Sequence, residues 1–339
     1  MTGERNFTSF KNFSAYTIEP YNTNYRKILS GVYNDFAKKA ASEYRFELEP
    51  VSYEKFIQSI EKGLLECIIL SESGIPTAFL VYTTLISEAV ELNIIHCIGS
   101  IDINKKRSLL LEKFIELNKQ TLRRKIAAYP MLGSQQEFAE DIKNFGFKTV
   151  DTAVLSFKFS DAAALNKLKE MNIDYSDRNY TVSNWKWMYK KQAAEIIHNS
   201  FKDSADALFD NRYCTLKGCT DIVSKITESI YGAFLPDISK VLLYKGRPAG
   251  IIFVNLTNNE TANIPAAAVL KKHRNKGLSK LMLKNAMFDL VNKVIAAGSL
   301  LKEVNVSCDA ACEPAYKMYL SAGFSQDYTY PTAYLPVSN

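Results

Sequence analysis

The chain has 339 residues, 47% of them hydrophobic and 23% charged, a composition typical of folded globular proteins that excludes a disordered chain. Because this length exceeds one ordinary hydrophobic core, we expect two domains. No apolar run approaches the roughly 18 residues that cross a bilayer, and residues 1–12 are too polar for a secretory signal. The net charge of +6 comes without the aromatic-interleaved basic stripe of a nucleic-acid surface. We therefore expect a cytoplasmic protein whose partner is neither a membrane nor a nucleic acid.

The predicted elements, taken in chain order, occur twice. A strand leads into helical sequence, a hairpin turns at a Gly-x-Pro segment (Gly-Ile-Pro in the first copy, Gly-Arg-Pro in the second), and a Gly-Phe pair closes a short helix before an extended segment. The matching positions are Tyr16 and Tyr180, Gly74 and Gly246, and Gly146 and Gly323. Three matches in the same order, each spaced by about half the chain, favour two copies of one domain over chance similarity.

Each copy alternates strands with helices, which predicts an α/β fold with a mixed sheet flanked by helices. Between the copies, Leu165, Leu168 and Met171 lie on one side of a predicted amphipathic helix. The sequence therefore predicts a first domain at 1–159, a linker with a helix at 160–177, and a second domain at 178–339.

The cysteines lack the spacing of a metal site. Cys308 and Cys312 lie four residues apart with no second close pair nearby, and Cys214 and Cys219 have no histidine at zinc-site spacing. We expect free thiols and no metal.

A short apolar strand at 262–270 leads through basic residues into a loop that opens a helix. This basic loop consists of Arg274, Asn275, Lys276, Gly277, Leu278 and Ser279. Apolar residues then recur at three- and four-residue spacing, which predicts a buried helix face that ends at Gly298. The N–H groups at a helix start have no partners, and Gly277 would let a ligand approach closely. The pattern predicts an anion site, with a solvated basic turn as the alternative for the loop by itself.

A second motif lies nearer the carboxyl end, where a strand at Val304–Cys308 precedes a helix and then a Gly-Phe pair. With both motifs in this order, the second half resembles the GNAT acyltransferase superfamily. The first signature of that family, Arg/Gln-x-x-Gly-x-Gly/Ala, matches Arg274 and Gly277 and departs from the pattern at Ser279. The resemblance reaches the first half only through the repeat.

The second signature of the family is Asn-x-x-Ala-x-x-φ-Tyr-x-x-x-Gly-Phe, where φ is apolar. It matches Ala315, Met318, Tyr319, Gly323 and Phe324. Cys312 stands where asparagine is common, which removes one expected contact at the helix start.

The resemblance implies two tandem GNAT-like domains and an acyl-CoA, above all acetyl-CoA, as co-substrate. The pantetheine arm would pair with the exposed strand edge around Ala267 and Val269, and the pyrophosphate would lie on the N–H groups of Asn275–Ser279, with Arg274 nearby. An amine would attack the thioester directly without a metal. Tyr319 would protonate the departing thiolate as catalytic acid, with a core aromatic as its alternative role.

The general base and the acceptor stay open at this stage. The strand at 262–270 has no carboxylate, so Glu260, Asp206, Asp210 and a water held by Asn263 are all candidates. The aromatic residues that could line an acceptor site, or merely pack in a final hairpin, are Phe209, Tyr213, Tyr328, Tyr330 and Tyr334.

The first copy lacks the glycine-containing loop and the tyrosine of the second copy. The segment 101–108 has no glycine at the required spacing, and Ile142 stands four residues before Gly146, where the second copy has Tyr319. We expect this copy to keep the fold without binding CoA and to wall off an acceptor site.

Three functions compete at this point. The leading hypothesis is an N-acyltransferase that acts on a primary amine of a small-molecule acceptor. The others are a CoA-binding sensor or interaction module without turnover, and a protein or peptide N-acetyltransferase.

Overall fold

The computed structural model describes residues 16–42, 50–84, 89–99, 102–118, 125–128, 140, 142–171, 177–295, 298 and 300–336. The chain divides into two compact units, one of residues 1–147 with 335–339 and the other of residues 148–334. Within the described residues, no helix combines the length and the apolar character that a membrane crossing requires. All six cysteines are free thiols.

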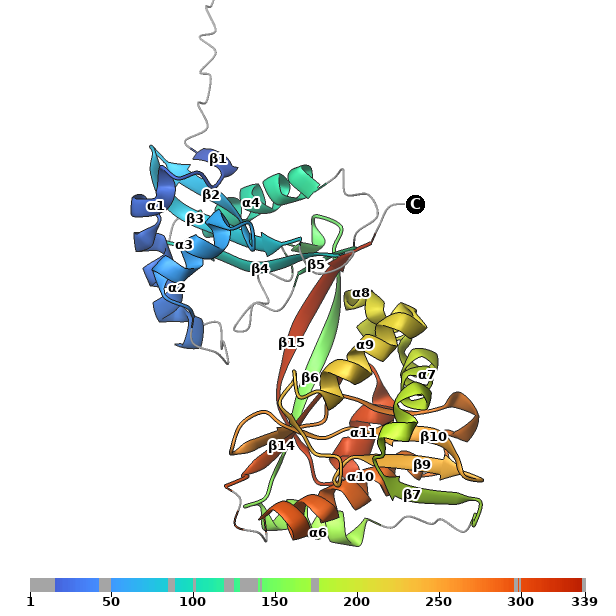
Figure 1. The fold of residues 1–339 in the computed structure, drawn as a ribbon. Coiled ribbons are helices and arrows are strands. Elements are labelled where there is room, and N and C mark those ends of the chain that lie inside the picture. Colours follow the sequence, from blue (N-terminus) through green and yellow to red (C-terminus); the bar gives the residue numbers. More distant parts are fainter. Residues whose placement is uncertain are drawn as a thin grey trace, which may run out of the picture. The chain divides into compact units, whose positions relative to one another are not determined.

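The first unit is a mixed sheet with helices packed against it (Figure 1). Its elements are β1 (Tyr16–Pro20), α1 (Tyr25–Ile28), α2 (Ser30–Ser42), α3 (Tyr53–Glu61), β2 (Glu66–Glu72), β3 (Ile75–Thr83), β4 (Ala89–Cys97), α4 (Ile103–Asn118) and β5 (Lys125–Ala128). Strands β1 to β4 are antiparallel neighbours, and β5 joins β4 in parallel. Phe79 of β3 contacts Phe36 of α2 and Phe56 of α3, whereas Tyr82 contacts Phe114 of α4.

The second unit contains two sheets instead of one. Its elements are β6 (Lys148–Lys158), α6 (Ala162–Glu170), β7 (Tyr180–Asn184), η1 (Trp187–Tyr189), α7 (Lys190–Phe201), α8 (Asp206–Phe209), η2 (Asn211–Cys214), α9 (Leu216–Thr227), β8 (Ala233–Phe234), β9 (Lys240–Tyr244), β10 (Arg247–Ile252), β11 (Asn255–Leu256), β12 (Thr261–Asn263), β13 (Ala267–Val269), η3 (Lys271–His273), α10 (Leu278–Asp289), η4 (Leu290–Ile295, a π-helix), β14 (Glu303–Asp309), α11 (Glu313–Ser321) and β15 (Ser325–Leu335). One sheet runs β15-β6-β14-β12-β11-β8, and the other runs β13-β10-β9-β7.

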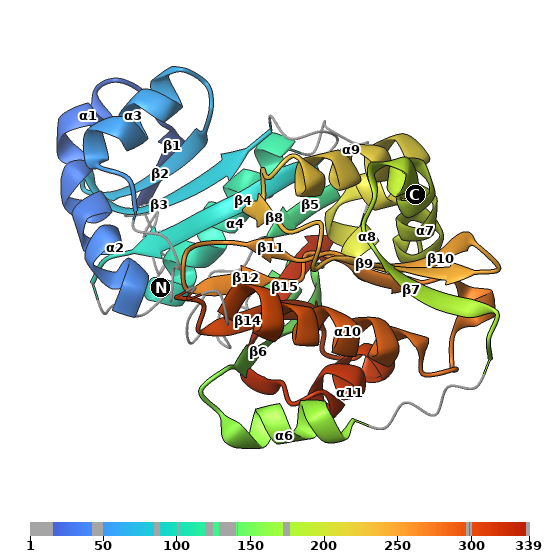
Figure 2. The same cartoon turned by 60° about the horizontal axis from the view of Figure 1, so that its bottom comes forward.

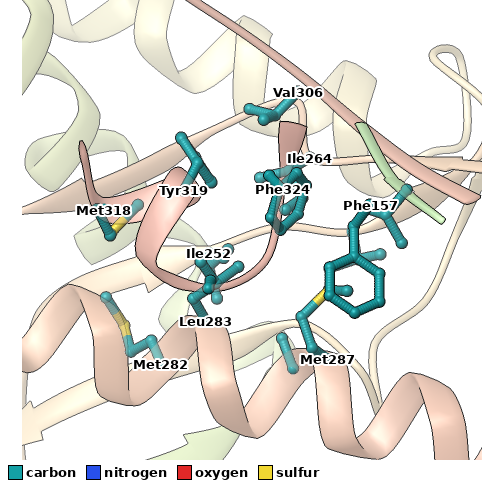
Figure 3. Packing of buried hydrophobic residues seen from close by; sticks show 14 of the residues in the cluster. Phe157, Ile252, Ile264, Met282, Leu283, Met287, Val306, Met318, Tyr319 and Phe324 are labelled. Carbon is teal, nitrogen blue, oxygen red and sulfur yellow. The ribbon is translucent and has the colours of Figure 1, made fainter. Parts of the chain in front are cut away.

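Helices cover both faces of the sheet β13-β10-β9-β7 (Figure 2). Because neighbouring residues of a strand point to opposite faces, Ile252 of β10 packs with Met282 and Leu283 of α10, whereas Ile251 packs with Ile197 of α7 and with α9. The core on the α10 side also takes in Met318 and Tyr319 of α11 (Figure 3). Residues of α6 belong to the same core. The predicted linker helix is present as α6, and it buries Leu168 and Met171 in this core.

The predicted strand 262–270 is in fact two strands that belong to different sheets. β12 pairs in parallel with β14, and the last bond on that side runs from the N–H of Ile264 to the carbonyl of Asn305 at 2.9 Å. Pro265 has no N–H to continue this ladder. From Ala266 onward the chain pairs with β10 instead, beginning with the bond from the Phe253 N–H to the Ala266 carbonyl at 2.9 Å.

The two sequence copies fold alike at their matching points. Both hairpin turns have two central residues with positive φ, Ser73 at 49° with Gly74 at 81° and Lys245 at 49° with Gly246 at 78°, which is the twist that suits a two-residue hairpin. The Gly-Phe corners also share a backbone bond: Phe147 donates to the Ile142 carbonyl at 3.4 Å, as Phe324 does to the Tyr319 carbonyl at 3.1 Å. The fold class predicted from the sequence is therefore confirmed.

Strand β6 belongs to the first copy by sequence but lies in the sheet of the second unit. It pairs with β14 from Lys158 back to Thr152, and on its other edge with β15. These pairings make the second unit begin at Lys148, whereas the predicted sequence boundary between the copies is at 159. The alternating pattern of a strand shows which face is buried but does not identify the strand that pairs with it.

Candidate functional site

The free edge of β13 lies where β12 and β13 separate from one another. Since Ala266 and Leu270 bond to β10, the backbone groups of Ala267 and Val269 alternate to the opposite side. The carbonyl of Val269 does point away from β10, because it accepts a hydrogen bond from Nε of Arg274 at 2.8 Å. This edge offers backbone groups to an extended ligand.

The basic loop connects this edge to α10. Gly277 adopts a left-handed conformation with φ of 70° at the N-cap of α10, and Asn275 is also left-handed at 61°. The first helical bond runs from the Leu281 N–H to the Gly277 carbonyl. Among the described residues, the backbone N–H groups of Asn275 to Lys280 donate to no partner. Unpartnered N–H groups at a helix start, on an exposed loop with the two cationic side chains of Arg274 and Lys276, form a favourable position for an anion.

A hydrogen-bond chain that runs from the surface to the buried His273 fixes the base of the loop. Lys276 Nζ donates to the Tyr180 hydroxyl at 3.3 Å, and that hydroxyl lies 2.7 Å from Nδ1 of His273. For Tyr180 to accept from Lys276 and donate onward, Nδ1 must carry no proton. Burial, with Lys272 and Lys276 nearby, lowers the pKa of His273 and favours that neutral form.

Tyr319 lies on α11 with only 4% of its surface exposed. Its ring packs edge-on against Phe324 at 5.3 Å, in the core that Figure 3 shows. Burial raises the pKa of its hydroxyl, and the thiols of Cys308 and Cys312 add to the effect. The hydroxyl makes no hydrogen bond with any described residue. A protonated hydroxyl with no partner is available to donate its proton.

An acidic group on α8 interacts electrostatically with the end of β14. Desolvation raises the pKa of Asp206 on α8 although the residue is exposed at the surface, and the charges of Asp309 and Asp210 act in the same direction. The raised pKa of the Cys308 thiol is due first to burial and then to Cys312, Asp309 and Asp206. The end of β14 therefore brings carboxylates, thiols and Tyr319 within electrostatic reach of one another. Sequence reasoning named Asp206 but not Asp309.

The other candidate bases have different partners. Asp210 forms a salt bridge with Arg212 at 2.6 Å, and Glu260 forms one with Lys302 at 2.7 Å. A carboxylate that is held by a guanidinium or ammonium group is a poor proton acceptor. Asp206 has no such cation among the described residues.

The aromatic candidates divide into contacts of different kinds. Phe209 meets Tyr334 edge-on at 5.7 Å, and Tyr213 stacks on Phe201 at 5.2 Å. Tyr328 and Tyr330 lie side by side along β15, as a final hairpin predicts. Phe209 ends the helix α8 that Asp206 begins, and the pKa of the Tyr213 hydroxyl is raised first by burial and then by the charge of Asp206. These two residues therefore belong to the acidic region.

In the first unit, helix α4 begins with the same backbone geometry as α10 but with an acidic residue at the N-cap. Asp102 is left-handed with φ of 57°, and its carbonyl accepts the first bond of α4 from Lys106 at 2.9 Å, as Gly277 does for α10. Its carboxylate accepts from the Tyr16 hydroxyl at 3.1 Å. Five residues lead from Cys97 at the end of β4 to this position, against eight from Val269 to Gly277. A shorter loop with a carboxylate repels the anion that the longer loop attracts.

The first unit also lacks a proton donor at the position that corresponds to Tyr319. Ile142 is fully buried and takes the backbone place of Tyr319 in the Gly-Phe corner. Its alkyl side chain has no proton to donate. The structure thus gives a physical reason for the predicted loss of CoA binding in the first copy, which stays a prediction.

Comparisons with known proteins agree on the fold. No family model matches the sequence, and no curated protein is similar to it. A GCN5-related N-acetyltransferase from Sphaerobacter thermophilus matches 96% of this chain over 97% of its own length, with a TM-score of 0.60 and 12% identity. A tandem GNAT protein from the clavulanic acid biosynthesis pathway matches 96% over 99%, with a TM-score of 0.53 and 13% identity.

A third solved structure matches only in part of its length. It is the GCN5-related glucosamine N-acetyltransferase region of a fungal multi-domain β-N-acetylglucosaminidase, and it matches 94% of this chain over 38% of its own, with a TM-score of 0.57 and 10% identity. The fold of this chain is therefore that of the GNAT N-acetyltransferases. The chain contains two copies of this fold in tandem, as the clavulanic acid pathway protein does.

Proposed function

We propose that the second unit is an acyl-CoA-dependent N-acyltransferase, with acetyl-CoA as its donor and a small-molecule primary amine as its acceptor. The observation that carries the proposal is the free edge of β13 leading directly into the unpartnered N–H groups of the basic loop. An extended pantetheine arm fits the edge, and a pyrophosphate fits the loop. Arg274 would exchange its bond to Val269 for the ligand.

The residues at the end of β14 supply the chemistry. The acceptor amine attacks the thioester carbonyl, the bond to sulfur breaks, and the thiolate takes a proton from the Tyr319 hydroxyl. The attacking nitrogen loses its proton to Asp206, whose raised pKa makes it a stronger base than an ordinary aspartate. In this scheme no step uses a metal.

The acceptor class and the location extend the proposal. Two proteins of similar fold are N-acetyltransferases by name, one of them a glucosamine N-acetyltransferase, which supports acetyl transfer to a small amine. We propose the cytoplasm as the compartment, because acyl-CoA is available there, and neither a nucleic acid nor a membrane as partner.

A CoA-binding module without turnover is the competing function, favoured by the lack of a carboxylate on β12 and β13. The test is CoA release from acetyl-CoA with a panel of small amines, followed with a thiol reagent. We expect release that depends on the amine. Tight binding of CoA without release for any amine would support the competing function instead.

The pH dependence of kcat/KM tests the role of Asp206. Because its pKa is raised above the ordinary value, the carboxylate takes up a proton as the pH falls, and kcat/KM should decline at a higher pH than an ordinary aspartate would cause. Asp206→Asn should lower kcat by about 100-fold and remove this acid limb. Asp210→Asn is the matched control, since Asp210 is already paired with Arg212. An unchanged acid limb in Asp206→Asn would assign the base elsewhere.

A further inference from the structure

A row of short polar side chains crosses five neighbouring strands of the second unit, in the order β15, β6, β14, β12 and β11. Each member is the direct pairing partner of the next, and the members are Ser325, Ser156, Asn305, Asn263 and Asn255. Paired residues on neighbouring strands point to the same face of a sheet, with Cβ atoms about 5 Å apart. These five residues, the polar row, therefore lie side by side on one face.

The polar row lies on the face of the sheet that points away from α10 and α11. The residues that alternate with it along the strands, among them Ile264 and Val306, pack in the core with those two helices. At one end of the row, Asn255 donates to the carbonyl of Ile226 on α9 at 3.1 Å. At the other end Ser325 is exposed. The row thus runs from beneath α9 to the surface.

Several polar groups of this row have no partner in the part of the chain that the structure describes. Three buried oxygens make no hydrogen bond: Oγ of Ser156, whose residue is 1% exposed, and Oδ1 of Asn305 and of Asn255. The amide of Asn263, a partly exposed residue, makes no side-chain hydrogen bond with a described residue either. Because buried polar groups in folded proteins are nearly always paired, four such groups on consecutive strands point to a ligand that completes the row.

The polar row passes the place where the acyl group would lie in the proposed function. Asn263 and Asn305 form the last pair of β12 and β14 before the chain crosses to β13. A pantetheine arm that begins at the basic loop would pass Val269 and then Ala267, so its thioester end approaches this separation of the strands. Ala267 lies four residues from Asn263, which is at most about 14 Å of chain. An acceptor with its nitrogen at the thioester can therefore extend onto the row.

The chemistry of the polar row favours hydroxyl groups. Its side chains carry no charge, and they combine amide oxygens that only accept, amide nitrogens that only donate and serine hydroxyls that do both. A carboxylate or phosphate has no proton to give to Oδ1 of Asn305, and an alkyl chain bonds to none of these groups. A ligand hydroxyl can donate to Asn305 while it accepts from Asn263 or Ser156.

We propose that the acceptor of the second unit is an uncharged amine that bears several hydroxyl groups, as amino sugars and amino polyols do, and that Asn263, Asn305 and Ser156 bind these hydroxyls. This inference rests on the proposed function and names its substrate class. The transfer step is unchanged: the nitrogen forms a bond to the acyl carbon, the bond from that carbon to sulfur breaks, and the hydroxyls do not react.

The test compares acceptors with and without hydroxyl groups: 2-amino-1,3-propanediol against 2-aminopropane, and glucosamine against cyclohexylamine. With acetyl-CoA saturating and kcat/KM expressed per unprotonated amine, the hydroxylated member of each pair should be better by about tenfold. Ser156→Ala and Asn263→Ala should each reduce this ratio by roughly fivefold, because each change removes a group that bonds the ligand and no group that bonds a described residue.

Ser200→Ala is the matched control. Ser200 on α7 also has a buried hydroxyl without a partner among the described residues, but it lies outside the polar row. The control should keep the preference for hydroxylated amines. A ratio that stays the same in Ser156→Ala and Asn263→Ala as in the control would overturn the inference and leave the acyltransferase standing.

Direct binding separates this inference from the function on which it rests. Calorimetric titration of glucosamine into the CoA-saturated full chain should show binding that weakens by roughly fivefold in Asn263→Ala, whether or not turnover occurs. Binding that depends on Asn263 without CoA release for any amine would keep the hydroxyl site and overturn the acyltransferase. Glucosamine that binds equally well to Asn263→Ala and to the unchanged chain would overturn the hydroxyl site.

Discussion

Tyr319→Phe is expected to lower kcat by on the order of 100- to 1000-fold while leaving the Kd for acetyl-CoA within about twofold. The hydroxyl has no hydrogen-bond partner among the described residues, and the ring packs on Phe324. Removing the oxygen therefore takes away the proton donor without disturbing the core. The Tm should stay about the same, because the change removes no hydrogen bond to a described residue.

The measurement is steady-state CoA release, together with a binding titration of each variant. Tyr316→Phe is the matched control: Tyr316 lies on the same helix, and its hydroxyl donates to Gln326 at 2.7 Å on the exposed side. The control should keep kcat within about threefold. A Tyr319→Phe enzyme as active as the control would make Tyr319 a core aromatic only.

Gly277→Asp should weaken acetyl-CoA binding by on the order of 100-fold. The change gives the second unit the residue that the first unit has at Asp102, where aspartate adopts the same left-handed conformation. The fold should thus accept the variant, while its carboxylate repels the pyrophosphate at the helix start.

Equilibrium binding of acetyl-CoA, measured beside Gly277→Asn, checks this expectation. Asparagine has the same shape as aspartate and tolerates positive φ, so it isolates the charge from the conformation. Asparagine should cost much less affinity than aspartate. Equal losses in the two variants would show that close approach of the backbone, and not charge, governs binding.

Features encoded within short segments were predictable from the sequence. The two hairpin turns, the Gly-Phe corners and the start of α10 at Gly277 each depend on residues adjacent in the chain, and the structure has all of them. The fold class followed from their order. The roles of Tyr319 and the basic loop stay predictions, although the structure gives these residues suitable surroundings.

Features that depend on pairing between distant segments were not predictable. The sequence predicted one strand at 262–270 and did not indicate that the chain passes from one sheet to another at Pro265. That change depends on the strands with which each half pairs, β14 for the first half and β10 for the second. Likewise, the electrostatic interaction between Asp206 and Asp309 arises only through the fold. An isolated aspartate in a sequence is most often solvated, so Asp309 carried no signal of its own.

The central claim is that one acyl-CoA site exists per chain, in the second unit. Calorimetric titration of acetyl-CoA into the full chain tests it most directly. We expect one molecule bound per chain, still one in Asp102→Gly because the first loop stays three residues shorter, and strong loss of that binding in Gly277→Asp. Two molecules per chain, or one that survives in Gly277→Asp with unchanged affinity, would contradict the account.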